Sequence, residues 1–402
     1  ASFLGWTLDA FDFFLLTFVV TRIATSFERG VADVAFAITL TLMCRPLGAL
    51  LFGWLADRYG RRTPLMVDIA CYSLLELATA FSPNFTVFLV LRALYGVAMG
   101  GEWGLGAAMA MEALPPQRRG FFSGLLQEGY MAGYLLAALA YYFVFTFTHW
   151  DWRGLFVIGV LPALLIFYIR SKVPESPVWL ERRARTVVQG RSFLLRSFAA
   201  HWPLVAYAIL FMGALNALSH GTQDLYATFL QKQHGFSPGI TSSLSIVAAF
   251  GAIAGGVVSG TLSQRFGRRA TIVACAVLAL CLIPLWAFSA TVVMLGVGAF
   301  TMQFAVQGAW GVIPAHLNEL SPADVRATFP GFTYQLGNLL AAGVAQIEAV
   351  YAQRFALAGH ASNYSAAMAM VTAAVLACVV ALTTLGYFVR REGREVSFTL
   401  TA

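Results

Sequence analysis

The chain has 402 residues, of which 59% are hydrophobic and only 11% are charged. A soluble globular protein carries about 25% charged residues, so this composition excludes a soluble globular protein. It predicts an all-α membrane protein with several spanning helices. The formal net charge of +7 does not indicate nucleic-acid binding, because the basic residues cluster in loops beside the apolar segments.

Twelve apolar runs are long enough to cross a bilayer as helices. They cover residues 3–25, 34–56, 64–82, 85–111, 121–146, 153–171, 202–230, 240–262, 270–288, 291–315, 328–352 and 365–389. A polar, basic stretch follows the sixth run. We therefore expect an N-terminal six-helix bundle (1–171), a cytoplasmic basic linker (172–200) and a C-terminal six-helix bundle (201–402). Because Ala1 lies close to the first run, we also expect that the natural N-terminus is longer.

The two halves repeat one another. The motif Gly53-Trp-Leu-Ala-Asp-Arg-Tyr-Gly-Arg-Arg62 returns 207 residues later as Gly260-Thr-Leu-Ser-Gln-Arg-Phe-Gly-Arg-Arg269. A second motif, Glu112-Ala-Leu-Pro115, returns at the same offset as Glu319-Leu-Ser-Pro322. Two motifs at one offset indicate an internal duplication, which is typical of transporters built from pseudo-symmetric bundles.

Basic residues are distributed unequally between the two ends of the predicted bundle. One end holds most of the arginines in the loops and the linker, whereas the other end has few basic residues: Arg22, Arg29, Arg153, Lys232 and Arg354. By the positive-inside rule, the basic end faces the cytoplasm. Both termini are then cytoplasmic, and the protein is multi-pass in an inner or plasma membrane.

The repeated Gly-x-Leu-Ala-Asp-Arg-x-Gly-Arg-Arg element resembles the signature of the major facilitator superfamily. The stretch Val173-Pro-Glu-Ser-Pro-Val-Trp-Leu180 resembles its sugar-porter and metabolite–proton symporter branches. Residues Asn216 to Thr228 match N-x-x-[ST]-H-x-[ST]-Q-D-x-x-x-T at each of its fixed positions. That pattern resembles the lactate/pyruvate–proton symporter family within the sialate–proton symporter branch.

This resemblance implies twelve transmembrane helices in two six-helix bundles that transport by alternating access. It implies a small organic-acid anion and a proton as partners, within the lipid bilayer. We expect no nucleic-acid partner, no cofactor and no metal, and we expect a monomer that is not an enzyme. The sequence shows no hydrolytic motif, no phosphate-binding loop and no Cys/His cluster, so energy must come from an ion gradient or from the substrate gradient.

The seventh apolar run contains a polar stripe. At about 100° per residue, Asn216, His220, Gln223 and Asp224 share one helix face, and ionisable groups at this depth are costly. An ionised Asp224 would repel a bound monocarboxylate and a protonated one would not, which couples proton and anion binding. Asn216, His220 and Gln223 would contact the substrate. The alternative is that His220 and Asp224 only pair with each other or hold another helix.

Arg45 lies near mid-membrane, and its counterpart in the second repeat is Ala252. A guanidinium there can bind a carboxylate through two parallel hydrogen bonds. The alternative is an ion pair with Asp9 or Asp12. Gln335 and Asn338 could donate hydrogen bonds to the same substrate, or could instead join helices.

Further ionisable residues are candidates for proton coupling. They are Asp9, Asp12, Glu102, Glu128 and Arg92, the last of which resembles the helix-4 arginine of the superfamily. Their alternative role is in structural charge networks. The glycines in Arg92-x-x-x-Gly96-x-x-x-Gly100 predict close helix packing.

The two motif copies are candidates for gating. The first copy contributes Gly53, Asp57, Arg58 and Arg61, and an Asp at a helix end can cap a helix of the other half. The second copy contributes Gln264, Arg265 and Arg268. Because Gln264 replaces the Asp, we expect a weaker contact there, or one made by neutral hydrogen bonds.

The sequence thus favours a proton symporter of small monocarboxylates, such as lactate or pyruvate. One alternative is a proton symporter of another organic acid, such as sialate, an aromatic acid or a dicarboxylic acid. Others are a non-transporting nutrient sensor and a passive pore, the pore being disfavoured because the repeated motifs indicate two moving bundles.

Overall fold

The computed structural model describes residues 2–60, 62–101, 125, 127–161, 163–164, 168–169, 175, 199–322, 329–356 and 362–389. Within these ranges every regular element is an α-helix. The first half contains α1 (Ser2–Ser26), α2 (Val31–Tyr59), α3 (Arg62–Ala80), α4 (Phe85–Met99), α7 (Gly129–Phe147) and α8 (Trp152–Ile158). The second half contains α12 (Trp202–Gln223), α13 (Tyr226–Lys232), α14 (Pro238–Phe266), α15 (Arg268–Ala287), α16 (Val292–Leu320), α17 (Phe329–Ala341), α18 (Val344–Arg354) and α19 (Tyr364–Val389).

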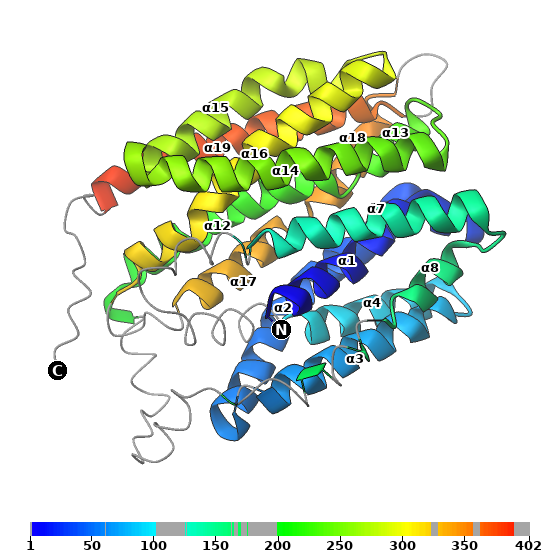
Figure 1. Ribbon diagram of the computed structural model, residues 1–402, viewed down its shortest axis with the longest axis horizontal. Helices are drawn as coiled ribbons and strands as arrows, with labels where there is room; N and C mark the ends of the chain where they lie inside the picture. The colour runs from blue at the N-terminus through cyan, green and yellow to red at the C-terminus, as the bar shows by residue number, and fades with distance from the viewer. Residues whose placement is uncertain are drawn as a thin grey trace.

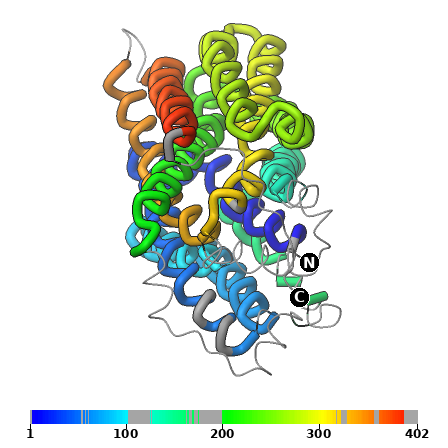
Figure 2. The backbone as a smooth tube through the Cα atoms, turned by 90° about the vertical axis from the view of Figure 1, so that its left-hand side faces the viewer, coloured from blue at the N-terminus to red at the C-terminus, as the bar shows by residue number. Residues whose placement is uncertain are grey.

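The helices run side by side in two groups (Figure 1; Figure 2). Helices α1 to α8 form one group and α12 to α19 form the other. The groups meet where α7 packs on α14, where α2 packs on α17 and α18, and where α1 contacts α13. Any site between the halves is therefore lined by these helices.

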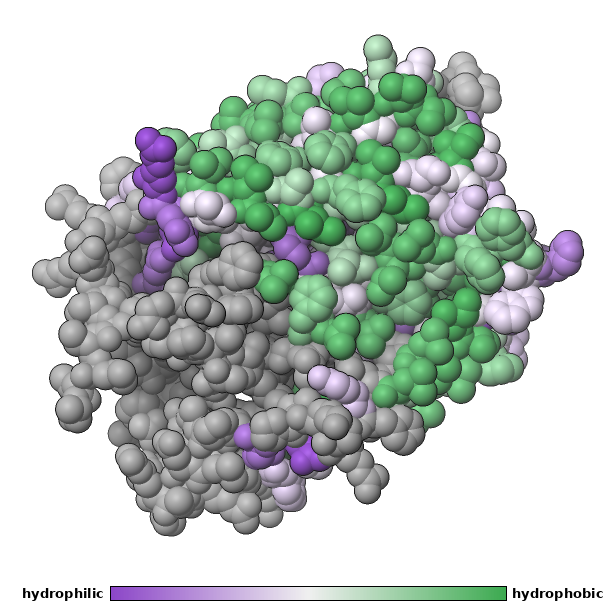
Figure 3. Space-filling view, in the orientation of Figure 1, coloured by the Kyte–Doolittle hydropathy of each residue, from purple (hydrophilic) through white to green (hydrophobic). Residues whose placement is uncertain are grey.

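The outer surface is apolar, as expected for a protein in lipid. Figure 3 shows apolar side chains over the face formed by α14 and α7, and large side chains such as Phe250, Val257 and Val293 are exposed. Nine helices in the described part of the chain are long and apolar enough to cross a membrane. These observations confirm the expected all-α membrane fold.

The duplicated segments adopt the same structure. Helices α2 and α14 both have 29 residues, and they begin and end at positions 207 residues apart. Each ends at a glycine with positive φ, 95° at Gly60 and 88° at Gly267. Non-glycine residues rarely adopt this conformation, so the motif needs a glycine at both turns. We call the end of the bundle that holds these two turns the basic end.

Two expected helices are interrupted. The run 202–230 was expected to be one helix, but α12 ends at Gln223 and α13 begins at Tyr226. The run 328–352 is likewise divided between Ala341 and Val344. In α12, the Thr222 hydroxyl donates to the backbone oxygens of Leu218 and Ser219, and such bonds compete with the helical ladder. Broken helices in transporters commonly lie at binding sites.

Glycines let α2 and α4 approach closely, as the sequence predicted. A Cβ on Gly96 would lie 2.2 Å from the Thr41 oxygen, and one on Gly100 would lie 1.9 Å from the Arg45 oxygen. Real Cβ atoms do not approach so closely, so both positions require glycine. This packing fixes the depth of Arg45 relative to α4.

Gly96→Ala should therefore destabilise the protein, although alanine favours helix formation. We expect overpacking to cost about 1–3 kcal/mol and to lower the midpoint of thermal unfolding in detergent by several degrees. Gly296→Ala is the matched control, because its added Cβ would lie an ordinary 3.4 Å from Leu244. Equal midpoints for the two variants would contradict the packing argument.

Candidate functional site

A small polar pocket lies between the two halves. Its volume is about 10 Å³, which is room for about one water molecule. The lining residues are Gln127, Tyr130, Asn216, Ser219, His220, Gln307, Trp310 and Tyr334. They come from the start of α7 and from α12, α16 and α17, so both halves contribute.

His220 and Asp224 form a buried pair beside the pocket. The Nδ1 atom of His220 lies 3.2 Å from Asp224 Oδ1 and 3.1 Å from Asp224 Oδ2. Asp224 is fully buried, and the edge of the His220 ring packs against Phe13 of α1, with 5.7 Å between ring centroids. Because Nδ1 is occupied by Asp224, Nε2 remains for a ligand, and the carboxylate fixes the orientation of the ring.

The other members of the stripe on α12 have different surroundings. Asn216 lines the pocket, while its Nδ2 donates to the Met212 oxygen at 2.9 Å. Gln223 lies outside the pocket lining: its Nε2 donates to Gln303 Oε1 at 2.8 Å. Sequence reasoning missed Gln303 and its neighbour Gln307, which donates to Ser219. Their spacing of four residues within an otherwise apolar helix was the available signal.

Arg45 is fully buried and faces Asp9. Its Nη2 lies 3.7 Å from Asp9 Oδ2, which is longer than a hydrogen bond. The Nε and Nη2 atoms donate no hydrogen bond to any residue that the structure describes. Arg45 also interacts electrostatically with Tyr130 and Tyr334, which line the pocket. The guanidinium therefore lies beside the pocket with unused donors.

A second ion pair lies deeper in the first half. Arg92 Nη1 donates to Glu76 Oε2 at 2.5 Å, and both side chains are fully buried. Asp12 lies close to this pair, because both Asp12 and Glu76 pack against Gly159. A Cβ atom on Gly159 would lie 2.6 Å from Glu76 Cγ and 3.2 Å from Asp12 Oδ1. Glu76 was missed in the sequence, where its position within an apolar run was the only signal. Three carboxyl groups (with Asp9) and two guanidinium groups thus share one buried region.

Gln335 and Asn338 lie outside the pocket lining. Gln335 Nε2 donates to the Gly100 oxygen at the end of α4, at 3.1 Å, and Asn338 Nδ2 donates to Gln335 Oε1 within α17, at 3.3 Å. Gln335 thus makes the interhelical hydrogen bond that was the alternative role for these two residues, whereas the bond of Asn338 stays within its own helix. The contact of Gln335 connects the second half to the first.

At the basic end, part of the first motif copy lies outside the described residues. Arg61 and the side chains of Asp57 and Arg58 are outside the described part, whereas Gly53 lies within α2. The proton-coupling candidate Glu102, which is not part of the motif, also lies outside the described residues. The backbone N–H of Arg62 donates to Glu175 at 3.3 Å. A carboxylate at a helix N-terminus is stabilising, so Glu175 caps α3. Sequence reasoning had noted the segment around Glu175 only as part of the resemblance.

In the second copy, Arg268 donates to Glu319 at 3.2 Å and to the Ser263 hydroxyl at 2.6 Å. These contacts stay within the second half. Gln264 and Arg265 are exposed, and neither hydrogen-bonds to a described residue of the first half. The expectation of a weaker contact at Gln264, or of one made by neutral hydrogen bonds, therefore stays a prediction.

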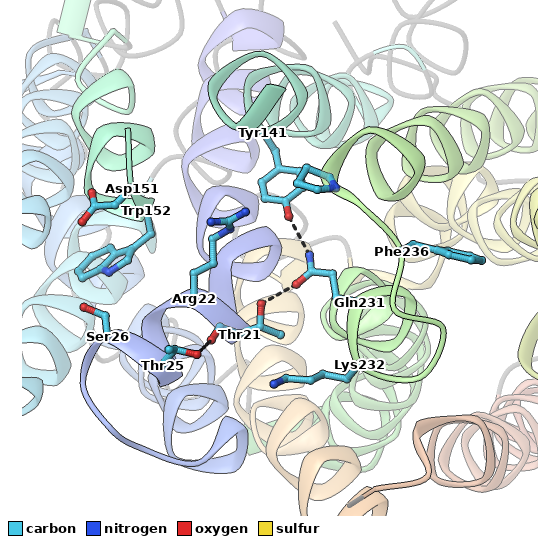
Figure 4. Close-up of a pocket in the computed structure, with 11 residues that line it drawn as sticks. Thr21, Arg22, Thr25, Ser26, Tyr141, Asp151, Trp152, Gln231, Lys232 and Phe236 are labelled. Carbon is cyan, nitrogen blue, oxygen red and sulfur yellow. Dashed lines mark hydrogen bonds between the residues drawn. The ribbon is translucent and has the colours of Figure 1, made fainter. Parts of the chain in front are cut away.

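A larger cavity of about 530 Å³ opens at the other end, between α1, α7 and α13. Arg22 and Lys232 are the basic residues that line it (Figure 4). At its base, Gln231 of α13 connects the halves: Thr21 Oγ1 donates to Gln231 Oε1 at 2.5 Å, and Gln231 Nε2 donates to Tyr141 Oη at 3.1 Å (Figure 4). Gln231 Nε2 also donates to the Phe18 oxygen at 3.3 Å. We call this set of bonds the Gln231 contact.

The described residues contain no group of three or more His, Cys, Asp or Glu side chains that could hold a metal ion. What the central site offers instead is an imidazole, amides, hydroxyls and a buried guanidinium. Such groups bind an anion or a hydroxylated small molecule and move protons.

Comparisons with known proteins agree with this architecture. A carboxylic acid transporter protein homolog of Saccharomyces cerevisiae is 32% identical over 94% of this chain, which spans 66% of that protein. A 4-methylmuconolactone transporter of Cupriavidus pinatubonensis, itself assigned as probable, is 28% identical over 85% of this chain and 80% of that protein. The crystal structure of a D-xylose–proton symporter matches with a TM-score of 0.75 at 18% identity, covering 94% of this chain and 95% of that one.

The family model described as the Major Facilitator Superfamily matches residues 2–346. The transporter relatives and the shared fold agree with it, and with the repeated motif at the basic end. The chain therefore belongs to the major facilitator superfamily, and it is a multi-pass membrane transporter rather than an enzyme.

Proposed function

We propose that the protein is a proton-coupled symporter of small monocarboxylates such as lactate or pyruvate. The observation that carries this proposal is the buried His220–Asp224 pair at a pocket between the halves, with the unused donors of Arg45 beside it. Two relatives are named as a carboxylic acid transporter protein homolog and a probable 4-methylmuconolactone transporter, which supports an organic acid as substrate.

In this mechanism Arg45 and His220 bind the substrate carboxylate from opposite halves. Arg45 is held loosely by Asp9 at 3.7 Å, so a carboxylate can replace Asp9 as its hydrogen-bonded partner. His220 offers Nε2, and Asn216 contributes an amide at the same pocket. Substrate binding then joins the two halves, which is the condition for a carrier that closes around its ligand.

The proton binds in the same region. With Asp224 protonated, the site no longer repels the anion, so proton and substrate favour each other's binding. Asp9, Asp12 and Glu102 are the remaining candidates for a proton site, and Arg92, paired with Glu76, would set the charge balance around them. A carboxylate and a proton moving together carry no net charge.

Alternating access requires contacts that break at each end in turn. At the basic end these would involve Asp57, Arg58 and Arg61, beside the Glu175 cap of α3. At the other end the Gln231 contact closes the path between the larger cavity and the central pocket. We assign the basic end, and both termini, to the cytoplasm by the positive-inside rule.

Transport of another organic acid, or a sensor function without transport, are the alternatives. Uptake of short-chain, aromatic, sialic and dicarboxylic acids into proteoliposomes, with and without an inward proton gradient, separates them. A small monocarboxylate should accumulate only with the gradient. Accumulation of only a larger acid would shift the substrate class, and absence of uptake and of counterflow for the whole panel would contradict a transport function.

Arg45→Ala should strongly weaken lactate binding. Losing a charge-assisted bidentate contact of about 1.5–3 kcal/mol lowers affinity by roughly 10- to 150-fold, as measured by calorimetry on purified protein. Arg45→Lys should restore little, because lysine cannot bind a carboxylate in two-point geometry. Since Arg45→Ala leaves Asp9 without its cation, the double variant Arg45→Ala, Asp9→Asn controls for folding. Near-normal affinity in the double variant would exclude Arg45 as the anchor.

Asp224→Asn should mimic the protonated carboxyl group. We expect this variant to bind lactate with less dependence on pH and to exchange labelled lactate across the membrane, but not to accumulate it on a proton gradient. His220→Ala should lose affinity without necessarily losing proton coupling, because the imidazole contacts the substrate and Asp224 carries the proton. Proton-driven accumulation by Asp224→Asn would move the proton site to another carboxyl group.

Gln231→Leu should weaken closure at the end opposite the basic end. The substitution removes the three hydrogen bonds to α1 and α7. The reporter is a Ser219→Cys substitution in a background without other cysteines. Its thiol should react several-fold faster with an impermeant thiol reagent added at that end. Gln233→Leu is the matched control, because Gln233 Oε1 accepts its bond from Tyr364 of the same half. Equal rates in both variants would show that Gln231 does not control access.

A further inference from the structure

Glu348 is a buried carboxyl group that the mechanism above does not use. It lies in the middle of α18 with no exposed surface. Neither of its carboxyl oxygens has a hydrogen-bond partner among the described residues. An ionised carboxylate without a partner in this environment would cost several kcal/mol, and ionisable residues at membrane depth usually serve a function.

Glu348 lies against the polar face of α12. A Cβ on Gly221 would lie 3.3 Å from Glu348 Oε1 and 3.3 Å from Val344 Cγ1. Gly221 follows His220 directly, and Asp224 lies one turn further along the same face, because residues three apart are neighbours on a helix. Glu348 also interacts electrostatically with Asp224. The glycine thus makes room for a carboxyl group beside the His220–Asp224 pair.

The helices packed on α18 bring few other charges to this place. Helix α19 contains no Asp, Glu, Lys, Arg or His. On α2, Asp33 lies at the exposed start of the helix and Arg45 is paired with Asp9. On α18 itself, the other charged residue is Arg354, which is exposed and stacks on Tyr351. His220 and Asp224 are therefore the titratable groups next to Glu348 in the described structure.

The charge count in this group leaves one carboxyl group unbalanced. Both oxygens of Asp224 lie within 3.2 Å of His220 Nδ1, so one imidazolium can balance one carboxylate. Two carboxyl groups close together in a water-poor site do not both ionise readily, and they titrate as a unit. We propose that Glu348 is a proton-binding residue of the transport cycle, placed beside the His220–Asp224 pair by its packing against Gly221.

This assignment rests on the proposed proton-coupled transport, and it names where the proton resides. The proton enters from the acidic side, resides on the carboxyl group of Glu348, and leaves to the other side when the substrate has left. The step transfers only the proton, and no other bond is formed or broken. Glu348 also comes from α18, which follows the break after α17, so the group spans two interrupted helices.

Two substitutions separate titration from shape. Glu348→Gln keeps the size of the side chain but cannot ionise, whereas Glu348→Asp keeps a carboxyl group on a shorter stem. Lactate binding is measured from pH 5 to 8 for both variants and for the parent, together with proton-driven accumulation and counterflow in proteoliposomes. Infrared difference spectra between acidic and alkaline pH report directly whether Glu348 carries a proton.

We expect Glu348→Gln to retain counterflow but to lose most proton-driven accumulation. Its pH profile of lactate binding should move by about one unit or more, because a neighbouring carboxyl group no longer competes for the proton. Glu348→Asp should retain pH dependence and part of the accumulation. The infrared band of a protonated carboxyl group present in the parent should be absent from Glu348→Gln.

An unchanged pH profile and full accumulation in Glu348→Gln would overturn the proposal, and would make Glu348 a neutral packing residue. If the parent itself shows no proton-driven accumulation, the proposed function fails. The infrared band then still decides the inference, because it reports protonation of Glu348 independently of transport. A spectrum that is identical in the parent and in Glu348→Gln contradicts a proton at Glu348.

Discussion

The structure depends on one constraint: charged side chains inside a membrane protein must be paired, neutralised or held for a function. Removing an ion from water costs several kcal/mol even after the protein relaxes. This chain nevertheless buries Asp9, Asp12, Arg45, Glu76 and Arg92 in its first half, each with at most 1% exposure. If all five are ionised, carboxylates outnumber guanidinium groups by one. The excess can be removed by a proton, which is why such a cluster suits a proton-coupled carrier.

The two repeats share their backbone structure, but they differ in the polar side chains that form the central site. Helices α2 and α14 have the same length and end in the same glycine conformation. The polar residues do not follow this symmetry: the positions equivalent to Arg45, Glu76 and Arg92 are Ala252, Ile283 and Ala299. The first half thus concentrates charge, and the second half presents an imidazole and amides. An anion between them meets cationic groups of one half and neutral donors of the other.

Much of the fold could be predicted from the sequence, because helix formation in a membrane follows from local composition. Apolar runs locate the helices, and the repeated motif locates the turns at Gly60 and Gly267. The interruption between Gln223 and Tyr226 could not be predicted, because the sequence has no proline there and continues with apolar residues on the far side.

The site was predicted in part, for a related physical reason. The stripe of Asn216, His220 and Asp224 follows from helical periodicity alone, and these residues do lie at or beside the central pocket. The partners of a charge depend on which helices are neighbours in space, which periodicity does not contain. Glu76 and Glu348 were missed for that reason, as were the contacts that Gln335 makes with Gly100.

The break in the seventh helix connects the two halves of the mechanism. His220 lies on the last turn of α12, Asp224 follows the end of that helix, and Gln231 lies on α13, beyond the break. A rigid helix would transmit any movement of Asp224 directly to Gln231. Helix α12 packs on α17 and α19, whereas α13 contacts α1 and α14, so the two segments have different neighbours. Because α13 begins two residues after Asp224, the proposed proton site lies at the junction of the two segments. In the proposed mechanism, this short stretch of chain would link protonation and substrate binding to closure at this end.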